Sequence, residues 1–110
     1  YGVNPWVALI AAGLCEIGWP LGFKVAQTAP AWRMAAISLS VASMALSGWL
    51  LFLAQKQIPM GTAYAVWTGI GAAGTFILGV AVFGDALNWG RALGVAMIIG
   101  GVVVLKAMTP

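Results

Sequence analysis

The chain has 110 residues, of which 63% are hydrophobic and 6% are charged, and its mean hydropathy is +1.03. A soluble domain of this size is less apolar and richer in charge, so the composition predicts an integral membrane protein. With no His, one Cys and two acids, the chain cannot assemble a metal cluster or a catalytic triad, and we expect neither enzyme activity nor a cofactor.

Continuous apolar runs predict four membrane-spanning helices joined by short connections, in a single domain of residues 1–110. A spanning helix needs about 20 residues, so this length accommodates four of them. The runs lack the alternation of barrel strands, which excludes a closed β-barrel. The fold class is therefore all-α integral membrane, and the predicted spans are 5–23, 34–54, 61–83 and 91–106.

The first span carries the carboxylate Glu16 past its middle. An ionisable side chain inside a span costs about 2.5 kcal/mol or more, so its default interpretation is functional. Gly13 and Trp19 share its helix face, and the Trp19 indole can donate a hydrogen bond to a carboxylate. Pro20 has no N–H and so leaves the Glu16 carbonyl without its helical donor. That carbonyl either contributes to cation binding or is satisfied by a neighbour or water at a simple kink.

The second span carries a stripe of hydroxyl groups, because Ser40, Ser43 and Ser47 recur at i, i+3 and i+7. A serine in a membrane helix most often donates to a carbonyl of its own helix. We expect this of two of the three serines, and we expect the third to face a polar cavity.

The third span is the most polar, and its first turns place Tyr64, Trp67, Thr68 and Gly71 on one face. Tyr64 and Trp67 have two interpretations. They are hydrogen-bond donors in a dry site, or they are aromatic anchors at the depth of the headgroups. Glycines in the following turns favour a kink or a flexible segment.

The fourth span has a face of small residues. Gly90 and Gly94 form a G-x-x-x-G pair, and Ile98 and Gly101 continue the face. Because small residues let membrane helices approach closely, we expect this face to pack against a second subunit rather than inside one subunit. Before it, Asp85 lies close to Asn88, and we interpret this acid as a solvated loop residue or an aid to starting the helix, not as a transport residue.

The cations are divided almost evenly between the two predicted sides of the membrane. Lys24, Arg33 and Arg91 lie on one side, and Lys56 and Lys106 lie on the other. Since an excess of cations normally sets orientation, this balance predicts insertion in both orientations and an antiparallel dimer with two Glu16 residues in one cavity. The alternative is a single orientation set by the weak bias. Anionic lipid headgroups are the expected partners of these cations, and nucleic acid is not.

Two motifs carry a resemblance to a known family that extends over essentially the whole chain. The pattern E-x-x-W-x(4)-K at residues 16–24 and the segment PMGTAYAVWTGIGA at 59–72 resemble the small multidrug resistance family. Trp19, the W-T-G-I-G form of the third span and the terminal V-L-K are closest to its guanidinium exporter subtype. The first connection is slightly longer than in the family, and Pro20 stands where a small residue is expected.

The resemblance implies an antiparallel, dual-topology homodimer in the bacterial inner membrane that exchanges protons for a cation. By position, the residues that match the family's substrate and proton site are Gly13, Glu16, Trp19, Ser47, Tyr64 and Trp67. We therefore expect proton-coupled export of guanidinium and small guanidinyl cations, in which proton and cation compete for Glu16. Guanidinium suits a carboxylate because its planar N–H groups can pair with both oxygens.

Three alternatives remain open from the sequence. The chain can be a multidrug exporter of quaternary ammonium or aromatic cations, a passive cation channel, or one subunit of a heterodimeric transporter.

Overall fold

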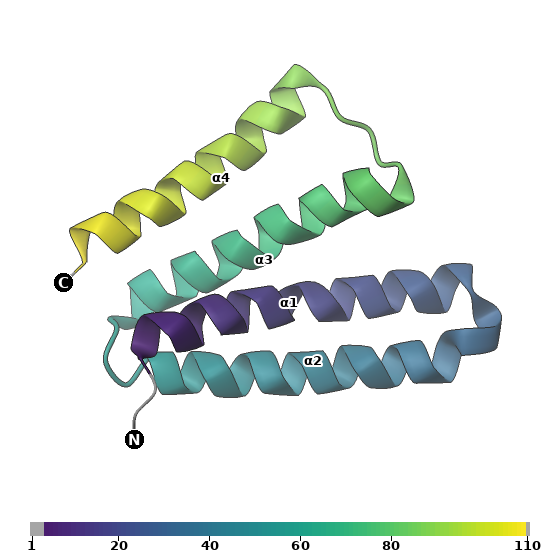
Figure 1. The fold of residues 1–110 in the computed structure, drawn as a ribbon, viewed down its shortest axis with the longest axis horizontal. Coiled ribbons are helices and arrows are strands. Elements are labelled where there is room, and N and C mark those ends of the chain that lie inside the picture. Colours follow the sequence, from purple (N-terminus) through teal and green to yellow (C-terminus); the bar gives the residue numbers. More distant parts are fainter. Residues whose placement is uncertain (1–3, 110) are drawn as a thin grey trace.

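The computed structural model describes residues 4–109, and these form four long helices with one short 3₁₀ turn. The α-helices are α1 (Pro5–Thr28), α2 (Arg33–Ala54), α3 (Met60–Phe83) and α4 (Trp89–Met108), and the 3₁₀ turn η1 spans Pro30–Trp32. Each α-helix is long and apolar enough to cross a membrane, which confirms the all-helical prediction. The helices lie side by side in the order α2, α1, α3, α4, in a slab of 46 × 37 × 18 Å (Figure 1).

Helix α1 is longer than the sequence predicted. It begins with Asn4 as its cap, whose side chain accepts a hydrogen bond from the Trp6 N–H at 2.9 Å, and it continues past Pro20 to Thr28. It ends where it does because the residue before Pro30 is disfavoured in the α conformation; Ala29 has φ −132° and ψ 79°. Most of the predicted first connection is therefore helical.

Helices α1 and α2 approach closely along the serine stripe. The Ser40 hydroxyl donates to the Trp19 carbonyl at 2.9 Å, and the Ser47 hydroxyl donates to the Ala12 carbonyl at 2.7 Å, both across to α1. The prediction that two of the three serines bond to their own helix is thus wrong. The cause is that Gly22 stands opposite Ser40, where an added Cβ would collide with the serine Oγ, so the two backbones come within reach of a short side chain.

Helix α3 ends at Gly84, which caps it with φ 70°, and α4 begins at Asn88. The Asn88 side chain accepts a hydrogen bond from the Arg91 N–H at 2.9 Å, so Asn88 starts α4 and Asp85 does not. Of the two interpretations of Asp85, the exposed loop residue is confirmed, and the cap that starts α4 is Asn88 instead.

Helix α4 lies along α3, and none of its described residues is buried. An added Cβ at Gly94 or Gly101 would meet no atom within 4 Å, so this glycine face is not packed inside the subunit. Ile98 is predicted to lie on the same face as these glycines. It instead lies beside Gly69 of α3 in the same subunit, and it is 39% exposed. Packing of the glycine face against a second subunit stays a prediction.

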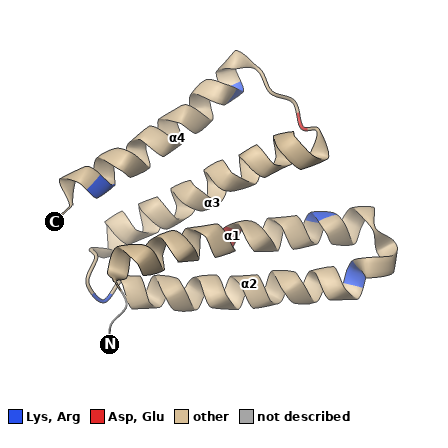
Figure 2. Cartoon of the chain, in the orientation of Figure 1, with Lys and Arg blue, Asp and Glu red and all other residues tan. Residues whose placement is uncertain are grey.

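Charge is confined to the ends of the helices, except for one position (Figure 2). The cations lie near the end of α1, at the starts of α2 and α4, after α2, and near the end of α4. The exception is Glu16, in the middle of α1. The helices therefore place the cations at the two ends of the bundle in the division that the sequence predicts.

The close contact of α1 and α2 predicts that Gly22→Ala destabilises the protein by about 1–3 kcal/mol, because the new methyl group overlaps Ser40 Oγ and would lie 2.7 Å from the Ala36 carbonyl. Denaturant unfolding in detergent micelles measures the change. Gly48→Ala in α2 is the matched control, since no atom lies within 4 Å of its added Cβ. Equal stability of the two variants would contradict this account of the helix contact.

Candidate functional site

Glu16 projects from the middle of α1 and contacts both neighbouring helices. On the α2 side, the Ser47 hydroxyl lies 3.3 Å from Glu16 Oε1. On the α3 side, Gly71 leaves the space that the glutamate occupies, because a Cβ at this position would lie 2.8 Å from Glu16 Cγ. The half-buried carboxylate is thus held between a hydroxyl group and a glycine.

Ser47 connects three groups through one hydroxyl. It is fully buried, and it accepts a hydrogen bond from the Trp67 indole N–H at 2.8 Å. Its single proton has two acceptors within reach, the Ala12 carbonyl at 2.7 Å and Glu16 Oε1 at 3.3 Å. Since a hydroxyl carries only one proton, it can donate strongly to only one of them at a time. The Ser47 proton can therefore respond to the state of Glu16.

A cavity of about 310 Å³ opens between α1 and α3 on the other side of the carboxylate. We call it the inner cavity; it is lined by Glu16, Trp19, Pro20, Thr68, Gly71, Ala72 and Thr75. Most of its lining surface is apolar, and the polar side chains among its lining residues are Glu16, Thr68, Thr75 and the Trp19 indole. The inner cavity can therefore offer several acceptors to a cation that carries N–H donors.

The structure brings together only some of the six predicted site residues around this cavity. Glu16 and Trp19 line it, whereas Ser47 and Trp67 contact each other on the α2 side of the carboxylate. Gly13 is buried against Ile70 of α3, where an added Cβ would lie 2.7 Å from the Ile70 Cβ, so its role is close packing of the two helices.

The two aromatic residues of α3 have different environments. The Trp67 indole donates to a buried hydroxyl, which favours a hydrogen-bonding role over a headgroup anchor. Tyr64 is 56% exposed and touches the Trp67 ring, with centroids 5.5 Å apart. On α1, Trp19 packs edge-on against Phe23, and within residues 4–109 its indole N–H makes no hydrogen bond to Glu16. The predicted bond from Trp19 to the carboxylate is not formed in this conformation.

Thr75 and Ala72 also line the inner cavity, although neither is among the predicted site residues. The spacing held a signal for Thr75, since Tyr64, Thr68, Gly71 and Thr75 continue one helix face. Within residues 4–109, the freed carbonyl of Glu16 accepts no hydrogen bond from a side chain, so its contribution to cation binding stays a prediction.

The hydrogen bond from Trp67 predicts the effect of removing the Ser47 hydroxyl. Ser47→Ala leaves a partly buried indole N–H without an acceptor, which is expected to cost about 1–3 kcal/mol. Trp67→Phe in the Ser47→Ala background should recover part of that loss, and a double-mutant cycle of unfolding free energies measures the recovery. Ser38→Ala is the control, because Ser38 is exposed and donates only to the Met34 carbonyl of its own helix. Additive effects of the two site substitutions would contradict the coupling.

Comparison with known proteins agrees with this architecture. The family model described as Small Multidrug Resistance protein matches residues 4–98. A guanidinium exporter of Proteus vulgaris is 45% identical over 101 residues, covering 92% of this chain and 95% of the relative. A guanidinium exporter of Escherichia coli K12 is 41% identical over 104 residues, covering 94% of this chain and 97% of the relative. With a family match over most of its length and relatives of this identity, the chain belongs to the small multidrug resistance family.

Proposed function

We propose that this protein exports guanidinium and small guanidinyl cations across the bacterial inner membrane in exchange for protons. The observation that carries the proposal is the position of Glu16. Its carboxylate accepts a hydrogen bond from the Ser47 hydroxyl on one side, and it lines the inner cavity on the other. The relatives at 41% and 45% identity that are named guanidinium exporters support the same substrate.

Proton and cation compete for the same carboxylate in this proposal. A guanidinium ion in the inner cavity pairs its planar N–H groups with the Glu16 oxygens, and it gives its remaining donors to the hydroxyls of Thr68 and Thr75. When a proton occupies Glu16 instead, the carboxyl no longer needs the Ser47 hydroxyl, which can donate fully to the nearer Ala12 carbonyl. Each ligand thus leaves a different hydrogen-bond arrangement around Ser47.

Exchange follows if the protein changes its open side mainly when Glu16 is occupied. We propose that this change takes place in an antiparallel homodimer, in which an inverted copy supplies a second Glu16. Two features support the dimer. The cations are nearly balanced between the bundle ends, and the glycine face of α4 has open space beside it in the single subunit.

Export of quaternary ammonium cations is the second candidate, because Trp19 lines the inner cavity and a ring face attracts cations that lack N–H groups. Guanidinium remains the better match, because it can donate hydrogen bonds to the carboxylate and to the threonine hydroxyls, whereas a quaternary ammonium ion is attracted to the carboxylate by charge alone. A comparison of the two substrate classes therefore decides between the candidates.

In proteoliposomes, the protein should take up guanidinium against its gradient when a proton gradient drives exchange, and Glu16→Gln should abolish this uptake. The reason is that the glutamine amide cannot bind and release a proton near neutral pH and has no charge to pair with the cation. Radiolabelled guanidinium uptake with imposed pH gradients is the measurement, with tetraethylammonium as the comparison substrate. Activity that survives Glu16→Gln would sink the proposed mechanism, flux without proton coupling would indicate a channel, and faster tetraethylammonium transport would favour the second candidate.

The balance of cations predicts that added charge controls orientation and activity together. Gln55→Lys with Gln57→Lys should hold one end of the bundle in the cytoplasm, and Gln27→Lys with Ala31→Lys should hold the other. Each double variant alone should be inactive, and the two coexpressed should restore guanidinium export from cells. Full export by either double variant alone would exclude the antiparallel arrangement.

A further inference from the structure

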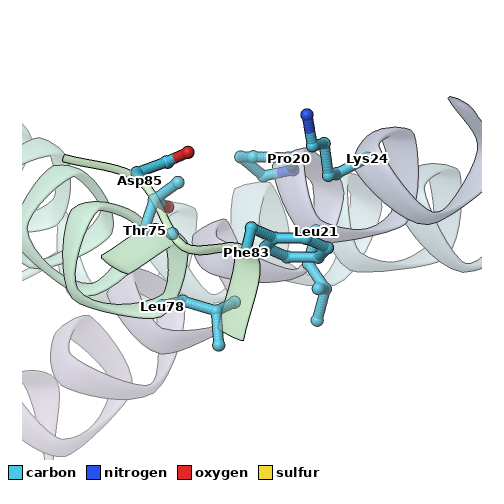
Figure 3. A pocket seen from close by; sticks show the side chains of 8 residues that line it. Pro20, Leu21, Lys24, Thr75, Leu78, Phe83 and Asp85 are labelled. Atoms are coloured by element: carbon cyan, nitrogen blue, oxygen red, sulfur yellow. The ribbon is translucent and has the colours of Figure 1, made fainter. Parts of the chain in front are cut away.

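The only two acids of the chain line cavities that adjoin each other. Glu16 lines the inner cavity, and Asp85 lines a second cavity of about 200 Å³ at the end of the same groove between α1 and α3. Pro20 and Thr75 line both cavities, so the two adjoin each other at these residues. We call the second cavity the vestibule; Figure 3 shows Asp85 beside Thr75 on one side of it and Lys24 with Pro20 on the other.

The backbone holds Asp85 at the wall of the vestibule. Gly84 turns the chain with φ 70°, and the Asp85 N–H then donates back to the Gly79 carbonyl at 3.1 Å. The carboxylate lies against Gly79, where an added Cβ would collide with Asp85 Oδ2. Asp85 is an exposed loop residue, and the turn at Gly84 together with the space beside Gly79 places its carboxylate at the edge of the vestibule.

The Asp85 carboxylate forms no ion pair with any residue of the described chain. The C-terminal end of α3 carries partial negative charge from its carbonyl groups, which disfavours an acid there. Lys24 lines the same vestibule, but within residues 4–109 it forms no ion pair with Asp85, and its Nζ lies 6.0 Å from the centroid of the Phe83 ring. A cation from solution would therefore be attracted to Asp85.

We propose that the vestibule captures the guanidinium cation before it reaches Glu16. Asp85 accepts hydrogen bonds from the N–H groups of the cation, and Thr75, which lines both cavities, marks the route from the vestibule to the inner cavity. Lys24 opposes the capture and keeps the cation from staying at Asp85. This inference rests on the proposed function and assigns Asp85 a transport role that the sequence analysis did not favour.

The test is the salt dependence of guanidinium uptake by the purified protein in liposomes. At low ionic strength, Asp85→Asn should lower kcat/KM by about threefold to tenfold, mainly by raising KM, because long-range attraction of the cation is lost. The loss should shrink at high sodium chloride, where exposed charges are screened beyond about 3–10 Å. Asp85→Glu, which keeps the charge, should retain most of the wild-type value.

Two further variants test the position of the Asp85 carboxylate and the charge opposite it, without changing Asp85 itself. Gly79→Ala should lower kcat/KM like Asp85→Asn, because it displaces the carboxylate while the charge and a helix-compatible residue are kept. Lys24→Gln should raise kcat/KM at low salt, whereas Arg33→Gln, which removes an equal charge outside the vestibule, should leave it unchanged.

Two results would overturn the inference in distinguishable ways. If the wild-type protein takes up guanidinium and Asp85→Asn shows the same kcat/KM and the same salt dependence, the capture role of Asp85 is wrong and the proposed function stands. If the wild-type protein takes up no guanidinium, the proposed function fails, and the capture of this cation fails with it.

Discussion

A carboxylate in the hydrocarbon core of a membrane needs protein groups in place of the water it has lost, and most of this chain is arranged around that need. Glu16 is the only charged residue in the middle of a described helix, and its environment depends on contacts made by α2 and α3. The Ser47 hydroxyl lies within hydrogen-bonding distance of the carboxylate, and Gly71 has no side chain to occupy the space of the glutamate. Neither contact is possible unless the three helices approach closely, so the small residues at their interfaces are conditions for the site as much as for the fold.

The interfaces divide into two kinds that differ in strength. Between α1 and α2, buried serines donate to carbonyls of the opposite helix, at Trp19 and Ala12. Between α1 and α3, contact consists mainly of apolar packing and glycine against side chains, as at Gly13 and Ile70. Directional hydrogen bonds resist sliding, whereas packing alone permits small shifts. If the groove between α1 and α3 opens and closes during transport, α1 and α2 are expected to move as one body.

Much of this arrangement could be predicted from sequence, and the exceptions have physical causes. The four helices follow from apolar length, and the importance of Glu16 follows from the cost of a charge in a bilayer. The partners of Ser40 and Ser47 could not be predicted, because a hydroxyl bonds to its own helix or to a neighbour depending on backbone separation. Asp85 is the exposed loop residue that the sequence predicts, but its place beside the groove could not be predicted, because it depends on the capping turn at Gly84.

The slab is 18 Å in its shortest dimension, less than the width of two helices of about 10–12 Å each, so a single copy offers one wall of a passage and cannot surround it. In the proposed homodimer, the same gene would encode both walls and present the same groove to both compartments in turn. Any substitution would then change inward-facing and outward-facing binding together. A single gene could therefore not encode different cation affinities on the two sides of the membrane. Such a difference would require duplication into two chains, each with its own fixed orientation.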